Sequence, residues 1–211
     1  MNARIRLLAS LLPAILIVAG CASTPPSTFY TLTPIPEARG RSLPLAEGGL
    51  AIGLGPFEFP EFLERPQIVS RAGANRLALD ELHRWGGSLP DDFLRVTGEN
   101  LAHLLDTSRI QVYPAEARFP LDFRVIADVL SFESSPAGEA LLRVRWTILD
   151  PYREQARVVR ETSYRSQARG PDREATIAAL SETVGELSRD LADELRRLPK
   201  TKPLDLEPRP G

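Results

Sequence analysis

Apolar and polar residues alternate with a period of two in several short stretches of the chain, a pattern that is typical of β-strands. We expect strands in the following ranges: 29–32, 50–54, 57–59, 67–71, 76–80, 109–113, 121–129, 140–148 and 158–168. The residues Gly73-Ala74-Asn75 separate two of these stretches and predict a hairpin turn. A helix over residues 74–85 is the alternative there, because the leucines of this range and Trp85 fit both periods poorly.

Two other segments have the period of an α-helix. Ser88 or Asp91 can cap a helix that has Pro90 in its first turn and ends near Asp106. Residues 172–198 predict the longest helix, about 40 Å at a rise of about 1.5 Å per residue. Its leucines recur every three or four residues and predict a helix that lies across a sheet, the alternative being a seam for a partner or a second copy.

The order of these elements predicts a single domain of the α/β (α+β) class. Three strands, over 121–129, 140–148 and 158–168, are separated by short turns and should form an antiparallel meander. The last of them is polar on both faces, as an edge strand or a pairing surface would be. We expect a mixed, mainly antiparallel sheet of about six or seven strands, with helices mainly on one face and a long C-terminal helix.

The first twenty residues have the composition of a secretory signal peptide. Arg4 and Arg6 form a basic head, and an apolar run from Leu7 to Val18 follows it. This run is too short to span a bilayer, which needs about 20 apolar residues, and Pro13 interrupts it.

The residues Val18-Ala19-Gly20-Cys21 resemble a bacterial lipobox, and Cys21 is the only cysteine of the chain. We therefore expect cleavage before Cys21, whose thiolate accepts a diacylglycerol, followed by N-acylation. Each buried methylene adds about 0.8 kcal/mol, so two or three chains form a durable anchor. A free buried cysteine and an uncleaved membrane anchor are the alternatives. Ala22 replaces the Asp that retains enterobacterial lipoproteins in the inner membrane, which favours the outer membrane.

These features divide the chain into four parts. Residues 1–20 are the predicted signal peptide, and residues 21–28 are a lipidated tether of small and polar residues. Residues 29–198 form the folded domain, and the proline-containing residues 199–211 are expected to be a disordered tail.

Charge and reactive residues exclude several functions. The formal net charge is −2 and no basic patch is evident, so we expect no nucleic-acid partner. His83 and His103 are the only histidines, and neither has ligands at metal spacing, so we interpret both as structural. We interpret the acidic pair Asp91 and Asp92 as solvated helix-cap charges. Glu61 and Glu64 are interpreted as solvated charges of a loop. Because no catalytic or nucleotide-binding motif is present, we expect no enzyme, no metal and no cofactor beyond the acyl chains on Cys21.

Several motifs together resemble the ABC-type transport auxiliary lipoproteins, the PqiC/YmbA-like group. The matching residues are the lipobox with Pro25-Pro26-Ser27-Thr28-Phe29-Tyr30-Thr31-Leu32, Ile52-Gly53-Leu54-Gly55-Pro56, Pro60 to Arg71, Asn75-Arg76-Leu77, Arg84-Trp85, Phe93 and Asn100-Leu101. The block Leu63-Glu64-Arg65-Pro66-Gln67-Ile68-Val69 is the most specific of them. The loop Gly86 to Pro90 departs slightly from the family pattern.

The resemblance implies an outer-membrane lipoprotein on the periplasmic face that contributes to envelope integrity. Its partners would be an MCE-domain protein and an ABC-type permease system that moves phospholipid or other hydrophobic molecules between membranes. A homo-oligomer is a further expectation.

The residues Arg65-Pro66-Gln67 and Arg84-Trp85 allow two interpretations. Pro66 can start a strand while Arg65 pairs with an acid, which is a structural role. Alternatively, this turn and Trp85 form an exposed contact for the MCE partner, since Trp and Arg are typical of interface hot spots.

Two functions therefore remain open from the sequence. The first is a non-enzymatic accessory lipoprotein that docks a lipid-transport system, and the second is a periplasmic lipid-binding carrier lipoprotein. A dry cavity between the meander and the long helix would favour the carrier, and a packed interior would favour the docking protein.

Overall fold

The computed structural model describes residues 25–38, 49–115 and 119–200. The predicted signal peptide, Cys21 and the predicted tail beyond residue 200 lie outside the described residues. The predicted tether is described from Pro25 onward.

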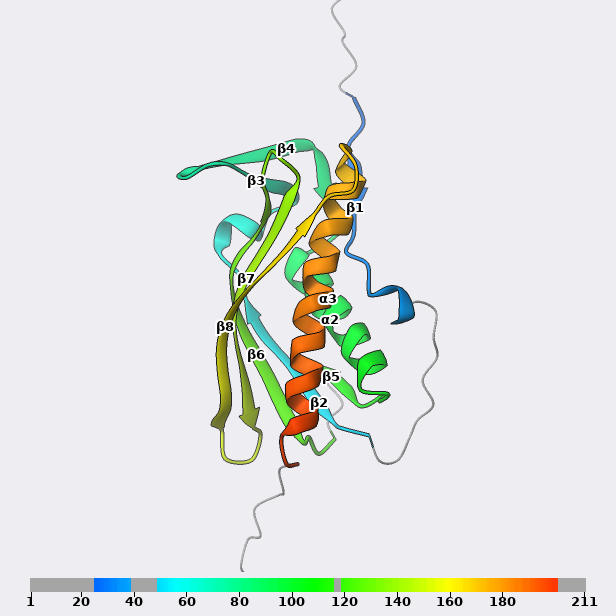
Figure 1. Cartoon of the computed structure of the whole chain (residues 1–211), viewed down its shortest axis with the longest axis vertical. Helices are drawn as coiled ribbons and strands as arrows, with labels where there is room; N and C mark the ends of the chain where they lie inside the picture. The colour runs from blue at the N-terminus through cyan, green and yellow to red at the C-terminus, as the bar shows by residue number, and fades with distance from the viewer. Residues whose placement is uncertain (1–24, 39–48, 116–118, 201–211) are drawn as a thin grey trace, which may run out of the picture.

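Within the described residues, eight strands form one mixed sheet (Figure 1). Its order is β1-β4-β3-β6-β2-β5, and β7 pairs with the other side of β6 and with β8. The strands are β1 Thr28–Tyr30, β2 Ile52–Glu58, β3 Gln67–Gly73, β4 Arg76–Trp85, β5 Ile110–Val112, β6 Phe123–Ser134, β7 Glu139–Asp150 and β8 Gln155–Gln167. The predicted fold class is confirmed, with more strands than the expected six or seven.

Strand β6 is the centre of the sheet. It pairs antiparallel with β7, which pairs antiparallel with β8, so the predicted meander is confirmed. On its other side, β6 pairs in parallel with β2 and, at its end, with β3 through Ser134 and Ser70. Among the described strands β8 pairs only with β7, which confirms it as an edge strand.

The alternative helix over residues 74–85 is wrong, because β4 continues as a strand to Trp85. The pairing explains why neither period fitted this stretch. Gln67 lies opposite Arg84 whereas the next residue, Ile68, lies opposite Asp80, so residues 81–83 bulge out of the ladder. The bulge interrupts the alternation of side chains between the two faces of the strand.

Both helices cover the same face of the sheet (Figure 1). Helix α2, Leu89–Leu104, begins after Ser88, whose hydroxyl accepts a hydrogen bond from the amide of Asp91. Helix α3, Arg173–Arg197, is capped in the same way by Asp172. Two short 3₁₀ turns, η2 Pro36–Ala38 and η3 Glu61–Leu63, complete the described elements.

The core lies between this helix layer and the sheet. One face of β7 contributes five fully buried side chains: Ala140, Leu142, Val144, Trp146 and Ile148. The leucines of α3 are buried against the sheet, among them Leu187, Leu191 and Leu195. The leucine repeat is therefore explained by packing on the sheet, and the interpretation as a seam for a partner is wrong.

Phe93 of α2 is the aromatic centre of this core. Its ring meets those of Phe57, Phe59 and Phe132 edge-on, with centroids 6.1, 5.4 and 5.3 Å away. Edge-to-face pairs of this kind stabilise a core beyond the burial of their area.

We predict that Phe93→Ala lowers the free energy of unfolding by about 3–5 kcal/mol, because it removes a fully buried ring and leaves a cavity. Urea unfolding followed by circular dichroism measures this change. The matched control is Phe29→Ala, which truncates a ring that is 64% exposed and should change stability by less than about 0.5 kcal/mol. Equal losses for the two variants would contradict this account of the core.

Candidate functional site

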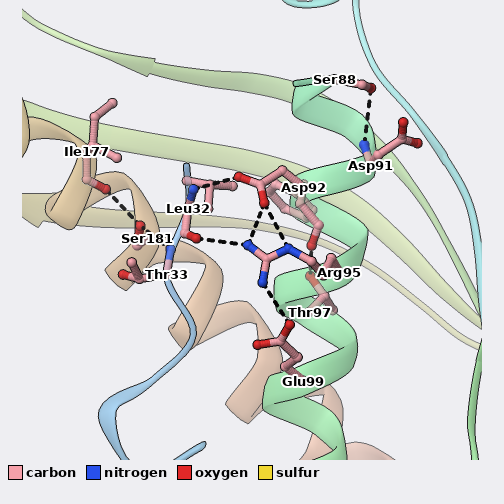
Figure 2. Close-up of polar contacts among 11 residues, drawn as sticks. Leu32, Thr33, Ser88, Asp91, Asp92, Arg95, Thr97, Glu99, Ile177 and Ser181 are labelled. Carbon is pink, nitrogen blue, oxygen red and sulfur yellow. Dashed lines mark hydrogen bonds and ion pairs between the residues drawn. The ribbon is translucent and has the colours of Figure 1, made fainter. Parts of the chain in front are cut away.

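Residues 31–35 follow β1 and lie across both helices (Figure 2). We call this segment the strap. The amide of Leu32 donates to Oδ2 of Asp92 at 2.6 Å, and the carbonyl of Leu32 accepts from Nη2 of Arg95 at 3.1 Å. Arg95 also binds Oδ1 of Asp92 and, at 2.7 Å, Oε1 of Glu99. Both polar groups of the Leu32 backbone are thus satisfied by one ion pair on α2.

The rest of the strap is bound by buried polar side chains. The amide of Thr33 donates to Oγ of Ser181 at 3.1 Å (Figure 2), and that of Ile35 donates to Oδ1 of Asn100 at 2.9 Å. The amide group of Asn100 in turn donates to Oγ of Ser188 on α3 at 3.1 Å. A single side chain therefore connects the strap, α2 and α3.

The strap approaches α3 closely because Gly185 has no side chain. A Cβ at this position would lie 3.0 Å from Cγ2 of Ile35. The prediction that Asp92 is a solvated cap charge is wrong, since its carboxylate binds the strap. The i,i+3 spacing of Asp92 and Arg95 was the one local signal of this pair.

The strap continues from β1, which adds a parallel strand to the edge of β4. The carbonyl of Tyr30 accepts from the amide of Gly86 at 2.7 Å, and the Tyr30 ring lies 5.8 Å from that of His83. The start of the domain, the strap and the β3–β4 hairpin therefore meet at one end of the molecule (Figure 1). We call it the hairpin end.

The five predicted contact residues come together at this end. The carbonyl of Pro66 accepts from the amide of Trp85 at 2.7 Å, and Gln67 lies opposite Arg84 in the β3–β4 ladder. Arg65 precedes this pairing and is exposed. The two sequence blocks that the family resemblance singled out separately are thus neighbours in space.

Their exposure separates them into two groups. Trp85 is only 5% exposed and belongs to the core, so the alternative interpretation of Trp85 as an exposed contact is wrong. Arg65 and Pro66 are exposed, while Gln67 and Arg84 are partly exposed. In the part of the chain that the structure describes, the Arg65 side chain forms no ion pair, which leaves it available to a partner.

A cluster of charges fastens the hairpin to the start of α3. The Asp80 carboxylate lies 2.6 Å from Nη2 of Arg173 and 2.9 Å from Nδ1 of His83. Burial alone would raise the pKa of Asp80, but the hydrogen bonds from His83 and Arg173 outweigh it and hold the pKa below its ordinary value. Nearby, Arg71 binds the buried carboxylate of Glu133 at 2.5 Å. Three members of the cluster, Arg71, His83 and Arg173, line an open hollow of about 860 Å³.

The described residues include no group of three or more His, Cys, Asp or Glu side chains that could hold a metal ion. The helices described here are not long and apolar enough to cross a membrane. His83 lies beside Asp80, and we find no arrangement of nucleophile and base around it in this part of the chain.

One hollow, of about 280 Å³, is lined by the strap, by small residues of α3 such as Ala178 and Gly185, and by Gln167 at the end of β8. Trp146, Leu142 and Leu187, which separate the sheet from α3, are fully buried in contact with the rest of the core.

Comparisons with known proteins give a family from a sequence model and a similar fold from solved structures. The model of the family described as "ABC-type transport auxiliary lipoprotein component" matches residues 30–192. A crystal structure of an uncharacterized protein is similar with a TM-score of 0.65 and 13% identity, over 81% of this chain and 99% of that one. A DUF330 protein from Xanthomonas campestris is similar with a TM-score of 0.59 and 19% identity, over 80% of this chain and 94% of that one. No curated protein sequence matches the chain.

We predict that Asn100→Ala loosens the strap. It leaves the Ile35 amide without its buried acceptor and should lower the free energy of unfolding by about 2 kcal/mol. Hydrogen exchange should accelerate at residues 31–35 more than elsewhere. Glu99→Ala is the control, because Glu99 is exposed and binds only Arg95 among the described residues. Unchanged exchange in the strap of the Asn100 variant would contradict its role.

We predict that the Asp80 carboxylate contributes to the loss of stability at low pH. Because the folded-state pKa of Asp80 lies below its unfolded value of about 3.9, the stability from its ionised form is complete above that value and is lost as the pH falls. Urea unfolding from neutral pH to about pH 3 should therefore show a smaller loss for Asp80→Asn than for the unchanged chain. The pKa of Asp150 is also low, because its hydrogen bonds outweigh the effect of burial. The contribution of Asp150 to the pH dependence of stability should therefore be unchanged in the Asp80→Asn variant. If the free energy of unfolding falls equally with pH in both proteins, Asp80 does not contribute to the acid sensitivity.

Proposed function

The chain belongs to the family of ABC-type transport auxiliary lipoprotein components, and from this premise we propose that it is a non-enzymatic accessory subunit of an intermembrane lipid-transport system. In this proposal an acylated Cys21 anchors the domain to the periplasmic face of the outer membrane. The domain docks an MCE-domain protein, whose system moves phospholipid through an ABC-type permease. Its work is to bind and position that partner.

The packed contact between α3 and the meander carries the choice of a docking protein over a lipid carrier. A carrier that shields acyl chains needs an apolar cavity of several hundred cubic ångströms. At this contact the large side chains Trp146, Phe123 and Leu142 fill the space and are fully buried. The carrier would have to open this core to accept a lipid chain, at the cost of the packing that holds the domain together.

We assign partner contact to the exposed and half-exposed residues of the hairpin end: Arg65, Pro66, Gln67 and Arg84. Arginine is enriched at interface hot spots, and an unpaired arginine loses no internal ion pair when it binds. Trp85 helps to position this surface, because its backbone amide donates a hydrogen bond to the carbonyl of Pro66. The free edge of β8 is the candidate surface for the homo-oligomer, since its backbone groups are open to a further strand.

The experiment is a pull-down of the membrane-extracted, full-length protein from its own host, with mass spectrometry of the proteins and lipids that accompany it. We expect an MCE-domain protein in stoichiometric amount and a diacylglycerol on Cys21. Phospholipid bound to a monomer without any such partner would support the periplasmic carrier instead.

We predict that Arg65→Glu weakens capture of the MCE-domain protein by about tenfold, the effect typical of an interface contact residue. Arg84→Glu should act in the same direction, and circular dichroism of both variants should remain unchanged. The matched control is Arg157→Glu on β8, an exposed arginine of a different strand. Equal capture by the Arg65, Arg84 and Arg157 variants would move the partner surface elsewhere.

A further inference from the structure

Three of the five exposed large apolar side chains of the described residues lie on β1 and β4, at the hairpin end. Five side chains fall in this class: Phe29, Leu79, Leu82, Val112 and Val159. Phe29 is 64% exposed on β1, and Leu79 and Leu82 are 43% and 36% exposed on β4. We call Phe29, Leu79 and Leu82 the apolar rim.

The rim lies on two neighbouring strands. In the β1–β4 ladder Phe29 is opposite Arg84, two residues along β4 from Leu82. Leu82 is one of the three bulged residues 81–83, whose backbone is held by hydrogen bonds to Oδ1 of Asp80. The bulge thus takes a leucine out of the regular ladder.

The chain leaves the domain toward Cys21 from the same end, and the C-terminal end of α3 lies at the opposite end (Figure 1). Seven residues lie between Cys21 and Phe29, which are therefore eight Cα-to-Cα steps apart. Fully extended, they span at most about 28 Å. An acyl anchor on Cys21 therefore keeps the hairpin end close to the bilayer.

We propose that the apolar rim rests on the lipid bilayer, with Phe29 and Leu82 at the level of the lipid headgroups. This inference rests on the proposed function, because it takes Cys21 as the anchor. In this orientation α3 points away from the membrane and its C-terminal end faces the periplasm. The β3–β4 hairpin then lies along the membrane surface and presents Arg65 beside it.

The charges around the rim suit a surface of lipid phosphates. Arg76 of β4 is exposed and is not among the residues assigned to the partner protein. The acidic Glu81 lies 3.6 Å from Arg84 and accepts a hydrogen bond from Gln67, so its charge is partly compensated. Apolar contact area and cationic side chains are the two attractions that hold a protein surface at a bilayer.

The test uses the acylated protein that begins at Cys21, in vesicles of phosphatidylethanolamine and phosphatidylglycerol. Because Cys21 is consumed by acylation, a new cysteine can be labelled uniquely with a fluorophore. We place it by Phe29→Cys or Leu82→Cys in the rim, and by Val112→Cys or Val159→Cys as matched controls at exposed valines outside the rim. A quencher attached to lipid headgroups should remove more than half of the rim fluorescence and leave the control fluorescence nearly unchanged.

A second variant tests the contact itself. Leu82→Asp in the Phe29→Cys protein should restore most of the quenched fluorescence, whereas Val159→Asp should restore none. Equal quenching at all four labelled positions, or stronger quenching at Val159, would overturn the orientation. Rim labels that remain unquenched on vesicles, while they are shielded by a second copy or by the partner protein, would also overturn it.

The mass of the N-terminal peptide shows whether Cys21 carries lipid, and so tests the anchor independently of the orientation. A chain without lipid on Cys21 would refute the anchor and this orientation with it. Acylated protein whose Leu82 label stays unquenched would refute the orientation alone and leave the proposed function standing.

Discussion

The apolar face of the sheet has to be covered, and this constraint organises the rest of the molecule. Alternate residues of β6 and β7 point to that face, and α2 and α3 bury them together with Trp146 and Phe93. Burial of large apolar side chains is the main favourable term in folding. Once both helices lie on one face, the other face and the edge strand β8 stay open to solvent or to partners.

The helix layer also determines where the chain leaves the domain. The strap crosses both helices and donates its amides to Asp92, Ser181 and Asn100. A buried amide without an acceptor is costly, so these side chains hold the strap in one path. The direction of the predicted anchor is therefore coupled to the same packing that forms the core, and the exposed rim with Phe29 is presented at that end.

Most charged residues at the hairpin end form ion pairs that hold the hairpin against the rest of the domain. Asp80 joins the hairpin to α3 through Arg173, and Glu133 joins it to β6 through Arg71. These pairs leave Arg65 as an arginine without an internal ion pair among the described residues. A rigid hairpin with an unpaired arginine and an apolar rim suits a protein whose task is to hold a position at a membrane and bind a partner.

Features that depend on neighbouring residues could be predicted from the amino-acid sequence. Alternation predicted the strands, Ser88 and the leucine repeat predicted the helices, and the lipobox with the block around Pro66 pointed to the family. Only the tertiary structure decided what depends on pairing between distant residues. The bulge at residues 81–83 comes from the register of β4 against β3, and Trp85 is buried because it is paired with Tyr30 of β1 and belongs to the core cluster. The role of Asp92 comes from a strap sixty residues earlier in the chain. Such contacts are chosen by the packing of the whole domain, which no local pattern of side chains encodes.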